Sequence, residues 1–162
     1  MRRGLVLLMT CVFAAFSAAS AHAQAKAENT PRAVLETYVA AWNQHDHAAF
    51  NKLLAPDGIH EDLAFGFHGQ GPAQVKDFMK EVLKMEPDFV WKLTNVIESG
   101  NTVAAEWTWT ATYTGDSPSG PVTAQHVTGR GATVAVIENG RIQRFSDYYD
   151  NASFFPKAPS GK

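Results

Sequence analysis

The sequence predicts an α+β fold in which one curved antiparallel sheet packs against helices on a single face. Two observations lead to this prediction. Apolar residues recur at helical spacing as far as Pro87, and the chain beyond it alternates between apolar and polar residues in long segments rich in Val, Thr, Trp, Tyr and Ile. Helices that come first and a meander of strands afterwards indicate a sheet with helices on one face and the other face free.

Residues 1–23 have the pattern of a secretory signal peptide. A basic pair, Arg2-Arg3, precedes an apolar run, and Ala21-His22-Ala23 forms an A-x-A cleavage site. The apolar run is too short to anchor the mature chain in a bilayer, so we expect a secreted or periplasmic protein with no membrane segment after cleavage near Ala23. The single cysteine, Cys11, lies in the segment to be removed, so neither a disulfide nor a thiolate metal site is expected.

The chain that remains after cleavage is long enough for one domain with its own core. We expect a flexible leader at 24–29, a domain at 30–155 and a tail at 156–162. Without its two N-terminal arginines the chain has 12 basic residues against 16 acidic ones. This balance gives no electrostatic footprint for nucleic acid or an anionic membrane, and it favours a small or neutral partner.

Three helices are expected before Pro87. The first spans 31 to about 44, because Thr30 is a good N-cap, Pro31 suits the first helical position, and an apolar stripe follows at Val34, Leu35, Tyr38, Val39 and Trp42. A short second helix is capped by Asp46 and ends in a turn at Pro56-Asp57-Gly58. A third opens at Gly71-Pro72.

Strands are expected at 89–97, 102–113, 122–137 and 141–149, separated by turns rich in Gly, Asn, Ser and Pro. Within 103–113 the odd positions include Trp107 and Trp109, whereas the even ones are mostly threonines. Because side chains alternate across a strand, the tryptophans should face the helices and the threonines should face outward.

The stretch GIHEDLAFGFHG, residues 58–69, raises the question of how Asp62 is used. Either it is a solvated residue in a loop after the second helix, or it is a carboxylate in an apolar pocket. Burial would raise its pKa and make it a usable base near neutral pH. The neighbouring Leu63, Phe65 and Phe67 favour burial.

Two further residues are candidates for chemistry. Tyr38 lies on the apolar stripe of the first helix, where a tyrosine is either part of the core or paired with Asp62. Asp147 shares one face of the last strand with Phe145 and Tyr149, so it faces the pocket if Phe145 does. Otherwise Asp147 is a sheet-edge residue or the partner of Arg144 or Arg130.

Aromatic residues predict a pocket for planar or ring compounds. The expected lining residues are Trp42, His60, Phe65, Trp107, Trp109 and Tyr149. His60 lies two residues from Asp62 and would share its face if the segment is extended.

No cofactor is expected, because the sequence contains no phosphate loop, serine elbow or dinucleotide fingerprint. The pair His45 and His47 has a ligand-like spacing but lacks a third nearby ligand, so no metal is expected either. His68 and His126 are isolated and receive no role beyond a place in the pocket lining.

The segment TYVAAWNQHDHAAFNKLLAPDGIHEDLAFG (37–66) resembles the opening of the ketosteroid isomerases, and RFSDYYD (144–150) matches the same NTF2-like superfamily, which includes the SnoaL-like polyketide cyclases and limonene epoxide hydrolases. The resemblance implies a cone, with a curved sheet wrapped on three helices around a deep apolar pocket. It also implies that Asp62 is a proton shuttle and that Tyr38 donates a hydrogen bond to the developing enolate.

The likeness also has defined gaps. The second oxyanion donor of the isomerases, a protonated aspartic acid, has no counterpart in Thr133-Val134-Ala135-Val136, and loss of one such donor typically costs about 10²–10³ in rate. Asp147 resembles a catalytic aspartate of the epoxide hydrolases, but the Arg-x-Asp pair that those enzymes need is replaced by Trp107 and Trp109.

These features predict a domain that binds a small hydrophobic carbonyl or ring compound. If it is catalytic, we expect cofactor-free isomerisation or cyclisation, with Asp62 as base, Tyr38 as oxyanion donor and Asp147 as second acid or orienter. One alternative is a non-catalytic ligand-binding domain. The other is a protein-interaction module, in which the outward row Thr108, Thr110 and Thr112 forms a homodimer interface, as the superfamily resemblance implies.

Overall fold

The structure is a computed structural model that describes residues 29–117 and 120–151. The expected signal peptide with its cleavage site, the leader up to residue 28 and the tail from 156 lie outside these residues. No helix in the described part of the chain is both long enough and apolar enough to cross a membrane.

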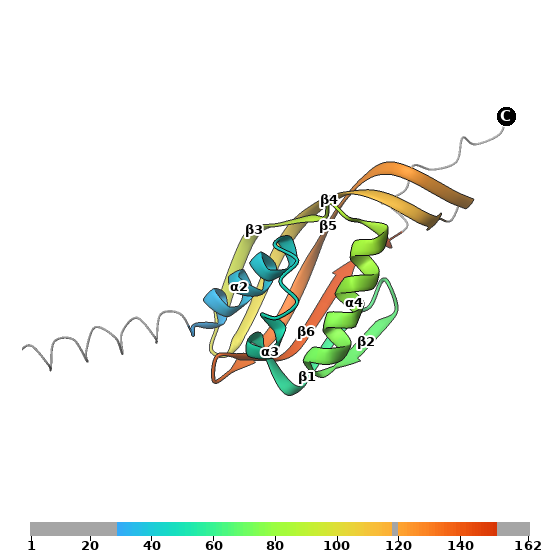
Figure 1. The fold of residues 1–162 in the computed structure, drawn as a ribbon. Coiled ribbons are helices and arrows are strands. Elements are labelled where there is room, and N and C mark those ends of the chain that lie inside the picture. Colours follow the sequence, from blue (N-terminus) through green and yellow to red (C-terminus); the bar gives the residue numbers. More distant parts are fainter. Residues whose placement is uncertain (1–28, 118–119, 152–162) are drawn as a thin grey trace, which may run out of the picture.

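Three helices lie on one face of a curved sheet (Figure 1). They are α2 (Pro31–Asn43), α3 (Phe50–Leu53) and α4 (Gly71–Met85). At the start of α2, the Thr30 side chain accepts a hydrogen bond from the Ala33 N–H at 3.2 Å, as the capping pattern predicts. The Asp46 carboxylate accepts from the N–H groups of Ala48 and Ala49, so it caps the turn that leads into α3.

Six strands form one sheet in the order β2-β1-β6-β5-β4-β3. They are β1 (Leu54–Asp62), β2 (Phe67–Gln70), β3 (Val90–Ser99), β4 (Thr102–Ser117), β5 (Gly120–Glu138) and β6 (Arg141–Tyr149). All neighbouring pairs are antiparallel except β1 and β6, which run parallel. The expected α+β class with a curved sheet and three helices is confirmed, whereas the expectation of a purely antiparallel sheet is wrong.

The predicted turn at Pro56-Asp57-Gly58 is also wrong, because these residues belong to β1. The register between β1 and β6 shifts between Leu54 and Ile59, so the proline lies in an irregular part of the strand. A side chain at Gly58 would meet the Ile142 carbonyl oxygen at 2.6 Å, which explains why a glycine stands where the two strands approach closely.

The alternation predicted for β4 is confirmed. Its odd positions are buried against the helices, and its threonines at 108 and 110 are exposed on the opposite face. The buried residues of this strand are Val103, Ala105, Trp107, Trp109, Ala111 and Tyr113.

The core under the sheet is strongly aromatic. Phe145 of β6 is fully buried, and its ring centroid lies 4.9 Å from that of Tyr38, 4.7 Å from His60 and 5.9 Å from Trp91. Phe145 therefore joins α2, β1 and β3 beneath the cavity described below.

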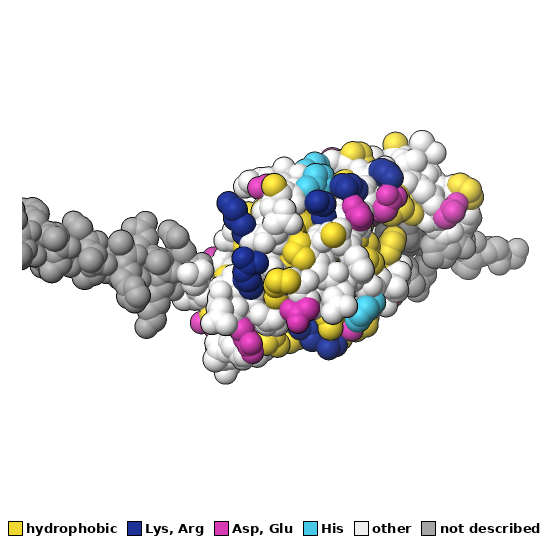
Figure 2. All heavy atoms as spheres, turned by 60° about the horizontal axis from the view of Figure 1, so that its bottom comes forward, with side chains coloured by type: hydrophobic (Ala, Val, Ile, Leu, Met, Phe, Trp, Pro, Cys, Tyr) yellow, Lys and Arg dark blue, Asp and Glu magenta, His cyan; other side chains and the backbone are white. Residues whose placement is uncertain are grey.

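The charged surface has no single dominant sign on the face shown in Figure 2. Both basic and acidic side chains are present on it, with hydrophobic side chains between them. No stripe of one charge crosses the described residues on this face.

Candidate functional site

The parallel pairing of β1 and β6 brings two carboxylates together. Asp62 and Asp147 are register partners, and His60 is the partner of Phe145. All three polar side chains are buried, with exposed fractions of 8% for Asp62, 6% for Asp147 and 1% for His60. Buried ionisable groups are rare unless they are paired or functional, so this cluster marks a candidate site.

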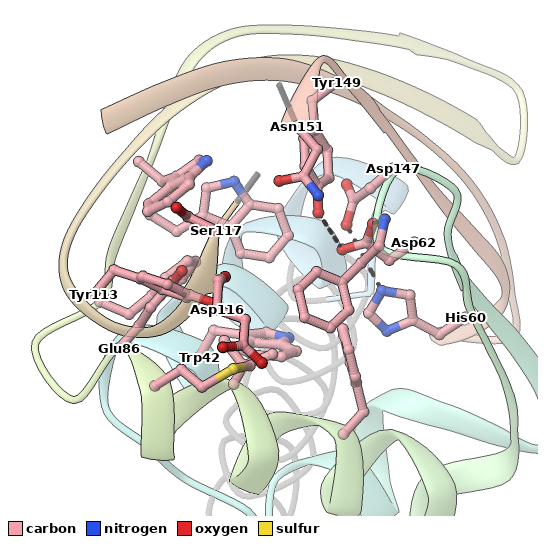
Figure 3. Close-up of a pocket in the computed structure, with 17 residues that line it drawn as sticks. Trp42, His60, Asp62, Glu86, Tyr113, Asp116, Ser117, Asp147, Tyr149 and Asn151 are labelled. Carbon is pink, nitrogen blue, oxygen red and sulfur yellow. Dashed lines mark hydrogen bonds and ion pairs between the residues drawn. The ribbon is translucent and has the colours of Figure 1, made fainter. Parts of the chain in front are cut away.

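The cluster lies in the wall of a cavity of about 540 Å³ (Figure 3). Such a volume is typical of a pocket for a small organic ligand. The wall comes mainly from α4, β1, β4 and β6, and most of its side chains are aromatic or aliphatic. The lining residues are Trp42, His60, Asp62, Phe65, Phe78, Val82, Met85, Glu86, Phe89, Trp91, Trp109, Tyr113, Asp116, Ser117, Asp147, Tyr149 and Asn151.

Asp62 is held in place by two hydrogen bonds from neutral donors. The Tyr149 hydroxyl donates to Oδ2 at 2.8 Å, and the Phe65 N–H donates to Oδ1 at 2.9 Å. Burial raises the pKa of Asp62; these hydrogen bonds oppose the shift, and the nearby charge of Asp147 adds to it. The net result is a carboxylate with a raised pKa, which is a stronger proton acceptor than a solvated aspartate.

The burial of Asp62 has a different cause from the one that the sequence suggested. Leu63 is 54% exposed and Phe65 is 49% exposed, so these neighbours do not enclose it. Asp62 instead lies beside β6, where the Tyr149 hydroxyl contacts its carboxylate.

Asp147 is fixed from the opposite side by the sheet. The Thr133 hydroxyl donates to its Oδ1, and Trp107 Nε1–H donates to the Thr133 oxygen at 2.8 Å. Its Oδ2 lies 3.6 Å from His60 Nε2. Arg144, one of the two arginines suggested as its partner, instead pairs with Glu61 at 2.5 Å. Asp147 therefore faces the cavity, on the same side of the strand as Phe145.

Tyr38 does not line the cavity, in contrast to the expectation from the sequence. It is fully buried, and its hydroxyl lies 2.9 Å from His60 Nδ1. Burial raises the pKa of Tyr38, so the hydroxyl keeps its proton and can donate it to Nδ1. In that tautomer Nε2 carries the ring hydrogen, but Nε2 lies 3.6 Å from Asp147 Oδ2 and has no hydrogen-bond partner among the described residues. Tyr38 thus reaches the site through His60.

Of the six expected pocket residues, five line the cavity and Trp107 does not. The Trp107 ring packs over Gly131, where an added Cβ would meet it at 2.6 Å, and its N–H is bonded to Thr133. The neighbouring tryptophan of the strand, Trp109, does line the cavity and stacks against Phe89 at 5.8 Å.

Glu86 is a wall residue that the sequence analysis did not single out. It follows the last residue of α4, where the helix dipole disfavours a negative charge. Burial, with the charges of Asp88 and Asp62, raises the pKa of Glu86 to about 7. The only local signal for it was a glutamate before Pro87 at a helix end, which does not predict that the side chain turns inward.

Replacement of Glu86 by glutamine should stabilise the protein at high pH. The folded pKa of about 7 exceeds the unfolded value of about 4.3, so the wild type loses stability as the pH rises from about 4 through 7. The difference between the Glu86→Gln variant and the wild type should therefore grow by about 1–3 kcal/mol between pH 4 and pH 8. Urea unfolding at several pH values measures this. Parallel stability curves for the two proteins would contradict a buried, strained Glu86.

No metal centre is formed by the described residues, since no three His, Cys, Asp or Glu side chains within 29–117 and 120–151 are grouped to bind one. His45 lies in an exposed turn with a positive φ of 54°, away from the cavity wall. His68 lies 3.3 Å from Glu61 on the surface.

The protein is a cone-shaped α+β domain with an acidic, largely aromatic cavity. The model of the SnoaL-like polyketide cyclase family matches residues 32–157, and the chain belongs to this family. The comparison with curated proteins gave no match.

Solved structures share the fold at low sequence identity. One is a protein of ketosteroid isomerase-like fold from Catenulispora acidiphila in complex with trimethylamine (21% identity, 76% of this chain and 97% of that chain, TM-score 0.65). Another is an NTF2-like protein of unknown function from Burkholderia pseudomallei (22% identity, 76% of this chain and 92% of that chain, TM-score 0.64). A third is a SnoaL-like polyketide cyclase from Agrobacterium tumefaciens (15% identity, 75% of this chain and 92% of that chain, TM-score 0.65).

Proposed function

We propose that this protein binds a small hydrophobic compound with a carbonyl or ring system in the cavity and moves a proton on it without a cofactor. The observation that carries the proposal is Asp62, a carboxylate only 8% exposed, with a raised pKa, in the wall of an aromatic cavity of about 540 Å³. The polyketide cyclase name of the family supports chemistry at an enolisable carbonyl.

The proposed reaction begins with removal of a proton from the carbon next to the carbonyl. The Asp62 carboxylate takes that proton, and the electron pair of the C–H bond forms the enolate. Return of the proton at another carbon completes an isomerisation. Attack of the enolate carbon on a second carbonyl of the same molecule, with the proton passed to the new alkoxide, completes an aldol-type cyclisation.

Residues around Asp62 have supporting roles in this proposal. The Tyr149 hydroxyl and the Phe65 N–H hold the carboxylate in one orientation. The Tyr38 hydroxyl contacts His60 and the Thr133 hydroxyl holds Asp147, so Asp147 is proposed as the orienter and Tyr38 as a positioning residue behind His60. The Asn151 amide is a further wall group with hydrogens for a substrate oxygen.

The direct test is exchange of the α-protons of 2-tetralone, an enolisable ring ketone, in D₂O followed by proton NMR. We expect exchange that is faster with the protein than in the same buffer with heat-denatured protein. Exchange at the buffer rate between pH 6 and pH 8 would remove the acid–base proposal. A shift of tryptophan indole signals by 2-tetralone without exchange would identify the non-catalytic binding alternative instead.

A further inference from the structure

Acidic side chains outnumber basic ones in the described part of the cavity wall. Four carboxylates line it, namely Asp62, Glu86, Asp116 and Asp147, and no lysine or arginine is among the described residues that do so. Figure 3 shows Glu86 and Asp116 on one side, and Asp62 and Asp147 on the other.

No ion pair within the described residues neutralises these four groups with lysine or arginine. Asp62 is bonded to a phenol and a backbone N–H, and Asp147 to a threonine hydroxyl with His60 at 3.6 Å. The contrast with Glu61 is direct, because this residue precedes Asp62, points to the other side of the strand and is paired with Arg144 at 2.5 Å. Within the described part of the chain, the outward acid of β1 is therefore paired with a cation and the inward one is not.

The rest of the wall is also suited to a positive charge. Eight aromatic side chains line the cavity: Trp42, Phe65, Phe78, Phe89, Trp91, Trp109, Tyr113 and Tyr149. Their rings meet at varied angles, with Trp42 edge-on to Trp91 at 86° and Phe89 nearly parallel to Trp109 at 23°. Aromatic faces carry partial negative charge, and several such faces around one space attract a cation, most strongly when it is desolvated.

We propose that the ligand of this cavity carries a positively charged, alkylated nitrogen in addition to its ring or carbonyl. This inference rests on the proposed function for the site. A tertiary or quaternary ammonium fits better than a primary one, because alkyl groups reduce the loss of hydration on burial and match an aromatic wall.

The proposed chemistry gives an independent reason for a cationic substrate. Proton removal by Asp62 leaves a negative enolate, and the remaining carboxylates of the wall would oppose that charge. Tyr38, the expected donor to the enolate, is bonded to His60 and does not line the cavity. A substrate with its own cationic nitrogen forms an enolate with no net charge, so the acidic wall no longer opposes the step.

The test uses two ketones of the same shape that differ only in charge, 4-(trimethylammonio)acetophenone and 4-tert-butylacetophenone. Affinities for the full protein are measured at pH 8 by quenching of tryptophan fluorescence. We expect the ammonium ketone to bind at least about 10-fold more tightly than its uncharged counterpart, in line with a desolvated cation–π site beside carboxylates. Equal affinities, or preference for the uncharged ketone, would overturn the charge inference and leave the proposed function untouched.

Variants separate charge from packing. The double substitution Glu86→Gln with Asp116→Asn keeps the size of both side chains and removes two charges. The double variant should bind the ammonium ketone at least about 3-fold less tightly, and its affinity for the uncharged ketone should change by less than that. Glu61→Gln, which removes one charge outside the cavity, is the matched control and should change neither affinity. If the double variant loses affinity for both ketones equally, the two carboxylates affect binding through the packing of the wall, and the charge inference is wrong.

The two proposals can fail separately. Catalysed exchange of 2-tetralone without preference for the ammonium ketone would support the acid–base function and contradict the cationic ligand. Preference for the ammonium ketone without any exchange of 2-tetralone would support the cationic ligand and contradict the acid–base function.

Discussion

Replacement of Asp62 by asparagine is expected to lower the protein-catalysed exchange of 2-tetralone by about 10²–10⁴, the range for loss of a positioned general base. Asparagine has the same size and can still accept from the Phe65 N–H and contact the Tyr149 hydroxyl, so the wall should keep its shape. Affinity for the ketone should therefore change little. Rates by NMR and affinities by fluorescence are measured on the same samples.

The matched control for this variant is Glu61→Gln. Glu61 is the preceding residue on β1, but its carboxylate accepts from Arg144 and Ser146 on the other side of the strand. Loss of that surface network should leave the exchange rate within a few-fold of the wild type. If Asp62→Asn behaves like Glu61→Gln, Asp62 has no part in the mechanism.

Phe145→Ala should have the largest effect on stability, a loss of about 3–5 kcal/mol. The ring is fully buried and contacts Tyr38, His60 and Trp91 from three different elements. Its removal leaves a void directly behind the His60 ring, which neighbouring strands cannot close without a backbone shift. Urea unfolding gives the free energy of unfolding.

Tyr148→Ala is the control for that loss. Tyr148 is also aromatic and lies three residues further along β6, but it is 48% exposed on the other face of the sheet. We expect a loss of less than about 1 kcal/mol for Tyr148→Ala. Similar losses for the two variants would show that the core is not organised around Phe145.

The sequence was most informative where the signal is local. Thr30 and Pro31 define the start of α2, and the alternation in β4 assigns its tryptophans to the helix side. Both signals depend on residues within a few positions of each other, so they survive in a single sequence.

Non-local pairing was not predictable in the same way. The parallel contact of β1 with β6 joins Asp62 to Asp147, which are far apart in the sequence, and no local pattern specifies such a partner. Pro56-Asp57-Gly58 has the composition of a turn, and only the irregular register with β6 accommodates it in a strand.

The candidate site was predictable in composition and less so in geometry. Helical spacing correctly placed Tyr38 on the inward face of α2. Periodicity cannot show, however, that its hydroxyl is hydrogen-bonded to His60. Glu86 was not predicted as a site residue. An acidic residue at a helix end is common, and the burial of this one depends on the cavity, which the local sequence does not show.

The central claim is that Asp62 is a buried base in the cavity wall. The most direct measurement is a carbon-13 NMR titration of the Asp62 side-chain carboxyl, assigned by the loss of its signal in Asp62→Asn. We predict a pKa above the ordinary aspartate value of about 3.9, because burial and the charge of Asp147 outweigh the two hydrogen bonds. A pKa at or below that value would contradict a buried base with raised proton affinity at Asp62.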